Sequence, residues 1–429
     1  MVGSFLTAAI VTTNVVNSWE LYLLYRHRLA HQTNVIPEAF RADVEPEAFR
    51  KTQEYSMDKI WFSMVCQVKN VVESTASLLA LPTVWYGVET VARQSGFFPA
   101  GLTRGGFTHA YLFTLFADVT STLLELPFSY YRTFVLEERH GFNKTTKKEF
   151  VKDTVKSFFL RAAVLDPLVV GLTTGVVKVF GEKFPLYLFG AAATLTAAAT
   201  YVFPALIQPL FNKFTPLPEG TLKSNVEALA KSLKFPLTKL FEVDGSRRSA
   251  HSNAYFYGFF NNKRIVLYDT LVKQLEEKQI LAVLCHEFGH WKHNHTSIMF
   301  VVGMLQLLGF CYGAQVALFH QQLYTDFGFV AGDQSAVMGF QLFSVVFFEP
   351  FSTLFGYLMS CVSRKFEFQA DAFAVSMGFG QELRTALYKM QDENKSSITP
   401  DWLFAALHYS HPPLVERLDA LEKEIKKSE

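Results

Sequence analysis

The 429-residue chain is short of charge, of cysteine and of repetitive sequence, and each shortage argues against a class of protein. Its 40 lysines and arginines nearly equal its 39 aspartates and glutamates, so it lacks the basic excess of a nucleic-acid-binding protein. Its four cysteines, Cys66, Cys285, Cys311 and Cys361, show no paired short spacing, which argues against a thiolate metal site and predicts buried free thiols. No low-complexity segment or internal repeat is evident.

Apolar residues, in contrast, make up 50% of the chain and gather in long runs. About twenty apolar residues cross the hydrocarbon core of a bilayer. Seven runs near that length predict a mainly α-helical, polytopic membrane protein, with spans at residues 3–25, 60–92, 107–131, 157–180, 185–210, 297–319 and 336–362. We interpret the first run as a membrane helix rather than a signal peptide, because Arg26 and Arg28 follow it and nothing basic precedes it.

Basic residues gather in alternate loops and predict the orientation of these spans. The loop after the third span is the richest, with Arg132, Arg139, Lys144, Lys147, Lys148, Lys152 and Lys156. The positive-inside rule therefore places the amino terminus in the lumen and the loops after odd-numbered spans in the cytosol. Residues 211–296 and 363–429 then share the cytosolic side of the membrane.

The predicted spans also carry ionisable residues, which are costly when they face lipid. They are Lys69 and Glu73 in the second span, Asp118 and Glu125 on one face of the third, Asp166 in the fourth and Glu349 in the seventh. Two interpretations stay open from the residues alone. Either the charges form salt bridges inside a tight bundle, or they line a polar, water-filled cavity.

Residues 281–291 contain a His-Glu-x-x-His motif within an apolar, helix-forming run. Four residues of separation rotate a helix by about 400° and advance it by about 6 Å, so His286 and His290 share one face and can bind one metal ion. Glu287 is adjacent in angle and can reach a water on that ion. A zinc hydrolase needs such a pair of imidazoles, an open coordination position and a carboxylate base. A chance pattern on a structural helix is the alternative.

A catalytic site of this kind needs a third protein ligand. The downstream candidates are His293, His295, Glu349, Glu367, Asp371, His408 and His411. We expect His293 to be solvated at the helix end and His295 to point elsewhere. Glu367 is favoured because it could complete a two-His, one-Glu site, and Asp371, one turn on, could orient a ligand histidine. The alternative is that both carboxylates pair with the two basic residues that precede them.

Residues 211–296 predict a small α/β insertion before the motif. Residues 240–244 and 264–269 are apolar or β-branched, as strands are. The stretch between them, residues 249–258, predicts an exposed strand. Such a strand beside a zinc helix could hold an extended peptide by strand addition, although an ordinary edge strand is the alternative.

Polar residues flank two prolines near the carboxy terminus. Pro412 and Pro413 stop any preceding helix, and a new helix is expected from Leu414. His411 could donate a hydrogen bond to the oxyanion of a tetrahedral intermediate. Arg417 could anchor a carboxylate through two hydrogen bonds. Residues at a helix start are often structural, so both roles stay open here.

Together these stretches resemble the type I CAAX prenyl endopeptidases, which are integral membrane zinc proteases. The likeness rests on residues 133–143, 209–217, 245–255, 286–291, 366–371 and 410–418. It implies seven tilted transmembrane helices around an intramembrane chamber, with a small α/β zinc-metalloprotease domain. The expected parts are residues 1–210 with five spans, 211–296 with the insertion, 297–362 with two spans and 363–429 with the third ligand.

The resemblance also implies a role for each candidate residue. One Zn²⁺ per chain would be bound by His286, His290 and Glu367, and Glu287 would be the general base. His411 and Arg417 would belong to the active-site surround, and Asp371 would lie behind the ligands. The substrate cleft would contain Asn253, Ala254 and Tyr255. The implied reaction removes the last three residues of a prenylated Cys-a-a-X terminus, and some family members cut a second time upstream. The alternatives are a quality-control membrane zinc protease acting on unmodified segments and a non-enzymatic membrane receptor or clearance scaffold.

The implied setting is the endoplasmic reticulum membrane, together with the inner nuclear membrane in animals. The catalytic side faces the cytosol, and the expected partners are the prenylated substrate and membrane lipid, with the chain as a monomer and no nucleic acid bound. Lys426 and Lys427 suit a retrieval signal for this compartment. A solvated basic tail is the alternative.

Overall fold

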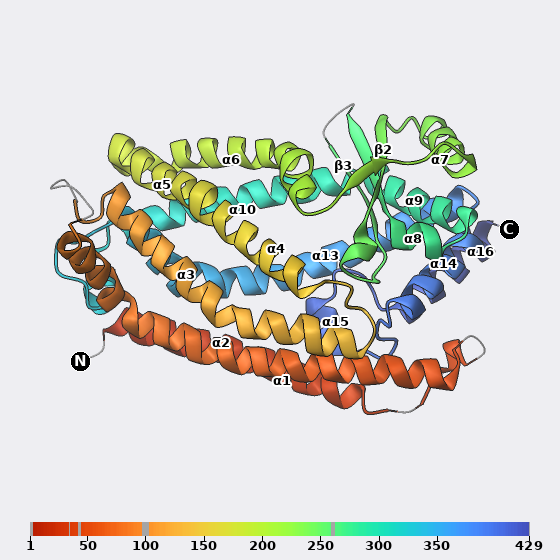
Figure 1. Ribbon diagram of the computed structural model, residues 1–429, viewed down its shortest axis with the longest axis horizontal. Helices are drawn as coiled ribbons and strands as arrows, with labels where there is room; N and C mark the ends of the chain where they lie inside the picture. Colours follow the sequence, from red (N-terminus) through yellow and green to blue (C-terminus); the bar gives the residue numbers. More distant parts are fainter. Residues whose placement is uncertain (1–2, 34, 42–43, 97–102, 259–261, 429) are drawn as a thin grey trace.

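The protein is described by a computed structural model that covers residues 3–33, 35–41, 44–96, 103–258 and 262–428. Long helices run along one axis, and a small sheet with its own helices lies at one end (Figure 1). The amino terminus lies at the opposite end from the sheet, whereas the carboxy terminus lies beside it. The fold class is therefore mainly helical with a small α/β unit, as predicted.

The long helices overlap the predicted spans, and two of them begin ten or more residues earlier. They are α1 (Ser4–Ala30), α2 (Pro46–Gln94), α3 (Phe107–Tyr131), α4 (Lys147–Leu160), α5 (Asp166–Phe180), α6 (Phe184–Val202), α10 (His295–Leu318), α12 (Ala336–Phe343) and α13 (Glu349–Ser376). Wider π-helical turns over Arg161–Leu165 and Ser344–Phe348 join α4 to α5 and α12 to α13. Each pair therefore forms one longer helical rod.

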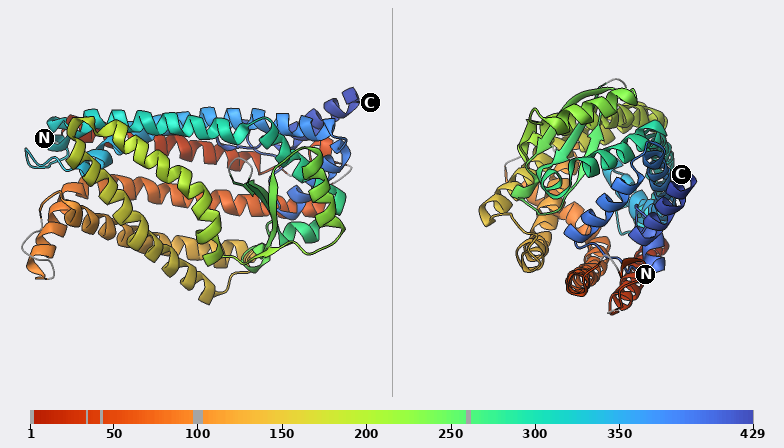
Figure 2. Two further views of the ribbon diagram at one scale, coloured as in Figure 1. Left: turned by 90° about the horizontal axis from the view of Figure 1, so that it is seen from above. Right: turned by 90° about the vertical axis from the view of Figure 1, so that its right-hand side faces the viewer.

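Three helical stretches of the described chain are long and apolar enough to cross a membrane: Lys147–Leu210, His295–Leu318 and Ala336–Ser376. The first stretch reverses direction at the turn Gly181–Lys183, so it holds the fourth and fifth predicted spans. The second and third stretches correspond to the sixth and seventh predicted spans. Helices α1, α2 and α3 match the first three predicted spans in position and do not meet the same criterion. Seen along the long axis, the helices surround that axis (Figure 2). The count of seven spans and the enclosed chamber stay predictions.

Ion pairs join several of the charged residues within the helical part. Lys69 on α2 lies 3.3 Å from Glu73 and 2.7 Å from Glu125 on α3. Asp118 on α3 lies 3.1 Å from Arg161. Salt bridges between helices, one of the two interpretations left open by the sequence, are therefore present for these residues.

The sheet has four strands in the order β1, β2, β4, β3. They are β1 (Phe214–Pro216), β2 (Leu237–Val243), β3 (Ala254–Tyr257) and β4 (Lys263–Tyr268). Strands β2 and β4 pair in parallel and contain most of the two predicted strands, while β3 pairs antiparallel with β4 and forms an edge. The predicted strand at 249–258 is thus a four-residue edge strand.

Helices pack on this sheet and bury its apolar face. They are α7 (Thr221–Ser232), α8 (Asp269–Gln274) and α9 (Glu277–Lys292). Helix α14 (Gly380–Glu393) packs on α8 and α9, whereas α15 (Trp402–His408) and α16 (Leu414–Ser428) pack on α13. The core joins Ile265 and Leu267 of β4 to Leu284 and Phe288 of α9, all at most 1% exposed. Complete burial of a phenylalanine contributes roughly 2–3 kcal/mol, so Phe288 fixes the motif helix against the sheet.

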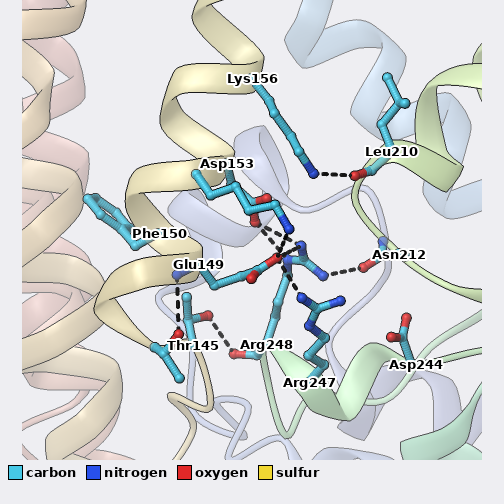
Figure 3. Close-up of polar contacts among 12 residues, drawn as sticks. Thr145, Glu149, Phe150, Asp153, Lys156, Leu210, Asn212, Asp244, Arg247 and Arg248 are labelled. Carbon is cyan, nitrogen blue, oxygen red and sulfur yellow. Dashed lines mark hydrogen bonds and ion pairs between the residues drawn. The ribbon is translucent and has the colours of Figure 1, made fainter.

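A cluster of hydrogen bonds and ion pairs connects the sheet unit to α4 (Figure 3). The Arg248 guanidinium donates to Oδ2 of Asp153 at 2.8 Å and 3.0 Å and to Oδ1 of Asn212 at 2.8 Å. Arg247 lies 2.7 Å from Glu149, in the first turn of α4. The hydroxyl of Thr145 donates to the carbonyl of Arg248 at 3.2 Å. We call these residues the α4 clamp.

The four cysteines are free thiols, as predicted, but they differ in exposure. Cys285 and Cys311 are buried, Cys66 is half-buried and Cys361 is exposed. The prediction of burial is therefore wrong for Cys361, because an apolar run does not tell which face of its helix packs inward.

Candidate metal centre and active site

Helix α9 presents the His-Glu-x-x-His motif toward α13. A capping box starts the helix, in which Glu276 and Gln279 each bond the other's backbone N–H. Gly289, inside the motif, allows a close approach to α13, since a Cβ at this position would lie 2.9 Å from Cα of Ala370. The two helices are thus near enough for side chains on both to meet at one point.

Three side chains converge between these helices. Nε2 of His286 and Nε2 of His290 lie 3.2 Å apart, and they lie 3.5 Å and 3.2 Å from the carboxylate oxygens of Glu367. Their ligand atoms all lie within 4.8 Å of one another, which is a spacing that one metal ion can bridge. Glu367 is only 3% exposed. A buried carboxylate that faces two imidazole nitrogens fits a divalent cation well, because the cation would stabilise its charge.

Asp371 and Arg417 stand behind His286. Oδ1 of Asp371 lies 2.8 Å from Nδ1 of His286, which leaves Nε2 of that ring directed at the metal position. Arg417 donates to both carboxylate oxygens of Asp371, at 2.9 Å and 2.6 Å. Asp371 and Arg417 are 2% and 7% exposed. The alternative was that the α13 carboxylates pair with Arg364 and Lys365. Among the described residues their ion pairs are instead with His286, His290, His411 and Arg417, and Arg364 donates to the carbonyl of Tyr409 at 2.8 Å.

His295 lies behind His290, which the sequence analysis did not predict. Its Nδ1 is 3.0 Å from Nδ1 of His290. The expectation that His295 points elsewhere is wrong, because it assumes that one helix continues from His290 to His295. Helix α9 ends before Asn294, whose φ of 57° is left-handed, and α10 starts a new direction at His295. Gln369, which contacts the other side of the His295 ring at 2.9 Å, was also missed.

Of the other third-ligand candidates, His293, Glu349 and His408 lie away from this point. His293 and Glu349 are exposed. His408 lies 3.0 Å from Glu20 of α1. His411 lies near the centre, with Nδ1 2.7 Å from Oε2 of Glu367, and its side chain is 66% exposed.

A cavity of about 280 Å³ opens beside the centre. Its lining includes Asn253, Ala254, Glu287, His411 and Arg417. Burial raises the pKa of Glu287, and a carboxylate whose pKa is nearer neutrality is a better proton acceptor for catalysis. The structure therefore brings most of the predicted substrate and catalytic residues to one cavity.

Tyr255, unlike the other two predicted substrate residues, does not line this cavity. Successive side chains of a strand point to opposite faces, so Ala254 and Tyr255 cannot both face it. Tyr255 instead directs its hydroxyl to Oε1 of Gln208, at 3.1 Å. Its contact with substrate stays a prediction.

A buried histidine, histidine and glutamate centre with an adjacent carboxylate, on a framework of long apolar helices, defines a membrane metalloendopeptidase. Residues 25–213 match the family model described as CAAX prenyl protease N-terminal, five membrane helices, and residues 216–425 match peptidase family M48. These two matches, together with relatives that are 36–42% identical over nearly the whole chain, show that the chain belongs to the CAAX prenyl protease family.

The relatives cover nearly the whole chain. A CAAX prenyl protease 1 homolog of Arabidopsis thaliana is 42% identical over 420 residues, which is 97% of each protein. The homolog of Homo sapiens is 36% identical over 455 residues, covering 97% of this chain and 94% of the relative. The crystal structure of S. mikatae Ste24p superimposes with a TM-score of 0.90 at 34% identity, over 97% of this chain and 99% of that one.

Proposed function

We propose that this protein is a zinc-dependent endopeptidase that removes the aaX tripeptide from prenylated CaaX proteins, with a second upstream cut in substrates that carry such a site. The observation that carries the proposal is the convergence of His286, His290 and Glu367 beside a cavity that also contains Glu287. The names of the full-length relatives support the substrate class.

His286, His290 and Glu367 would hold the zinc ion. Two imidazoles and one carboxylate are a donor set found in catalytic zinc sites. Zinc in such a site polarises a carbonyl and makes water nucleophilic near neutral pH. Oε2 of Glu367 faces nitrogens of His411 at 2.7 Å and Arg417 at 3.4 Å, which stabilise the charged carboxylate that a zinc ligand needs.

The chain's own residues then handle the protons and the peptide. Glu287 takes a proton from the attacking water and passes it to the leaving amine. His411 donates a hydrogen bond to the carbonyl oxygen as negative charge develops on it. Arg417 and Asp371 hold the His286 ring in the orientation that directs Nε2 at the metal.

The substrate would lie along the edge strand β3. An edge strand has an unpaired row of backbone groups, which can bind an extended peptide. Asn253 and Ala254 border the cavity at this edge, and Val283, Leu387 and Met390 form an apolar lining that suits the aliphatic residues of a CaaX terminus. The prenyl chain would lie among the apolar helices.

We also propose the arrangement in the membrane. The chain crosses the endoplasmic reticulum membrane seven times around a chamber, with the amino terminus lumenal and the sheet end cytosolic, and the same holds at the inner nuclear membrane in animals. It acts as a monomer in contact with lipid. The chain divides into four parts: residues 1–210 with five spans, residues 211–296 with the metalloprotease insertion, residues 297–362 with two spans, and residues 363–429 with the third zinc ligand. The three apolar helical stretches and the five membrane helices of the matching family model support this arrangement.

The test compares a farnesylated CaaX peptide with the unmodified peptide, using the wild-type protein and Glu287→Gln. Cleavage should require the farnesyl group, and Glu287→Gln should lower turnover by about 10²–10⁴-fold because it removes the proton acceptor. The zinc content of the variant should stay at one ion per chain. Equal rates on the two peptides would instead favour a protease for unmodified segments, and full turnover by Glu287→Gln would contradict the role of Glu287.

A further inference from the structure

His295 is a buried polar side chain that has no part in the mechanism above. It is 3% exposed, and its ring lies flat on Phe366, with centroids 4.0 Å apart and planes within 6°. Its Nδ1 lies 3.0 Å from Nδ1 of His290, and its Nε2 lies 2.9 Å from Oε1 of Gln369. Both nitrogens of this ring therefore have partners, and one partner is a candidate zinc ligand.

The chemistry at His290 determines where the protons lie in this chain of three side chains. His290 can bind a metal through Nε2 only when that atom carries no proton, so the neutral ring carries its proton on Nδ1. That N–H needs an acceptor, and Nδ1 of His295 is placed to accept. His295 then carries its own proton on Nε2 and donates it to Oε1 of Gln369.

The two histidines of the motif are thus supported in parallel ways. With both rings bound to zinc through Nε2, Nδ1 of His286 would donate to the carboxylate of Asp371 and Nδ1 of His290 to the neutral ring of His295. We propose that His295, oriented by Gln369, is the positioning residue that fixes the tautomer and ring plane of His290 for zinc binding. This inference rests on the proposed function, since it takes His290 as a zinc ligand.

Gln369 sets the direction of the hydrogen bonds. If its amide nitrogen faced His295, that ring would accept at Nε2 and carry its proton on Nδ1, toward His290. His290 would then have to accept at Nδ1 and protonate Nε2, which is the atom that zinc needs. A carboxylate at position 369 can only accept, so Gln369→Glu permits the productive direction alone. The Gln369 side chain is exposed, so the fold should tolerate this change.

Two substitutions at position 295 separate hydrogen bonding from packing. His295→Phe keeps a flat ring against Phe366 and removes the acceptor. His295→Asn loses the ring and keeps an oxygen at the position of Nδ1. The zinc dissociation constant of each full-length variant is measured in detergent by competition with a chromophoric chelator. We expect His295→Phe to weaken zinc binding about 10–100-fold, the usual effect of losing such a partner, and His295→Asn to restore much of that loss.

Matched variants complete the experiment. His293→Phe, at the exposed neighbouring histidine, should bind zinc like the wild type. Gln369→Leu should weaken binding and Gln369→Glu should not, and this pair decides the matter if His295→Phe does not fold. The inference is overturned if His295→Phe binds zinc as tightly as the wild type, or more tightly than His295→Asn.

His290→Ala distinguishes failure of this inference from failure of the proposed zinc site. If His290→Ala leaves zinc binding unchanged, the proposed site itself is wrong. If His290→Ala abolishes binding while His295→Phe leaves it intact, His290 is a ligand and His295 is not its positioning residue.

Discussion

Arg417 and Asp371 form a buried ion pair directly behind a candidate zinc ligand. Burial of charge is costly, and the cost is offset here by two hydrogen bonds between the guanidinium and the carboxylate. A third contact, of 3.4 Å, joins Arg417 to Glu367. One guanidinium thus faces both carboxylates that α13 contributes to the centre, so its loss should affect folding and metal binding together.

Arg417→Met should destabilise the protein by about 3–5 kcal/mol, because it leaves Asp371 as a buried charge without its main partner. Arg417→Lys should cost less, since an ammonium keeps the charge but cannot form the bidentate contact. Thermal unfolding in detergent measures both. Lys423→Met, which removes an exposed cation from the same helix, is the control. Equal melting temperatures for Arg417→Met and the control would contradict this account.

The spacing of α9 and α13 decides whether the ligands meet. Each helix contributes part of the centre, and Gly289 lies where their backbones are closest. An alanine Cβ there would approach Cα of Ala370 at 2.9 Å and Cβ of Phe373 at 3.2 Å. The backbone of Ala370 cannot move aside without displacing Glu367 on the same helix.

Gly289→Ala should therefore separate the helices and weaken zinc binding. Overpacking of this kind typically costs about 1–3 kcal/mol, although alanine by itself favours a helix over glycine. Gly303→Ala is the matched control, because a Cβ at Gly303 meets nothing within 4 Å. Zinc titration and thermal unfolding of both variants provide the measurement. If Gly289→Ala has the same zinc affinity and melting temperature as Gly303→Ala, the close approach of the two helices has no functional importance.

At the scale of the molecule, the α4 clamp connects the sheet unit to the long helices. Arg248 contacts Asp153 and Asn212, which belong to parts of the chain distant from the sheet turn in sequence. Hydrogen bonds to charged groups contribute about 1.5–3 kcal/mol each when a partner is lost. The clamp thus joins the loop before the edge strand to α4, and we expect it to hold the sheet unit against that helix.

Arg248→Met should lower the free energy of local opening of the sheet unit by about 1–3 kcal/mol, because Asp153 loses its partner. Hydrogen exchange of the backbone amides in β2, β3 and β4 measures this opening, and exchange in α10 should not change. Lys148→Gln removes an exposed cation from α4, the helix that Arg248 contacts, and serves as the control. Unchanged exchange in the sheet of Arg248→Met would show that the clamp does not hold the unit in place.

The outcome for individual residues shows where sequence reasoning succeeds and fails. Helical spacing predicted that His286 and His290 share a face, since that relation is local. Glu367 and Asp371 follow only from chemistry and family resemblance, because nothing in local spacing relates α13 to α9. Continuous helical spacing gives the wrong direction for His295, because the left-handed residue Asn294 ends the helical period. Strand alternation turns the side chain of Tyr255 away from that of Ala254, so adjacency in the sequence does not place both in one cleft.

The sequence by itself determined the apolar helices, the pair of histidines and the carboxylate beside them, since all of these depend on hydrophobicity and helical period over a few residues. The tertiary structure alone decided which downstream glutamate faces the histidines, which partners hold their rings and how the α4 clamp fixes the sheet unit. These relations join residues up to about a hundred positions apart, as between Arg248 and Asp153, 95 residues apart in the chain. Such contacts follow from how helices and strands pack, which no local pattern specifies.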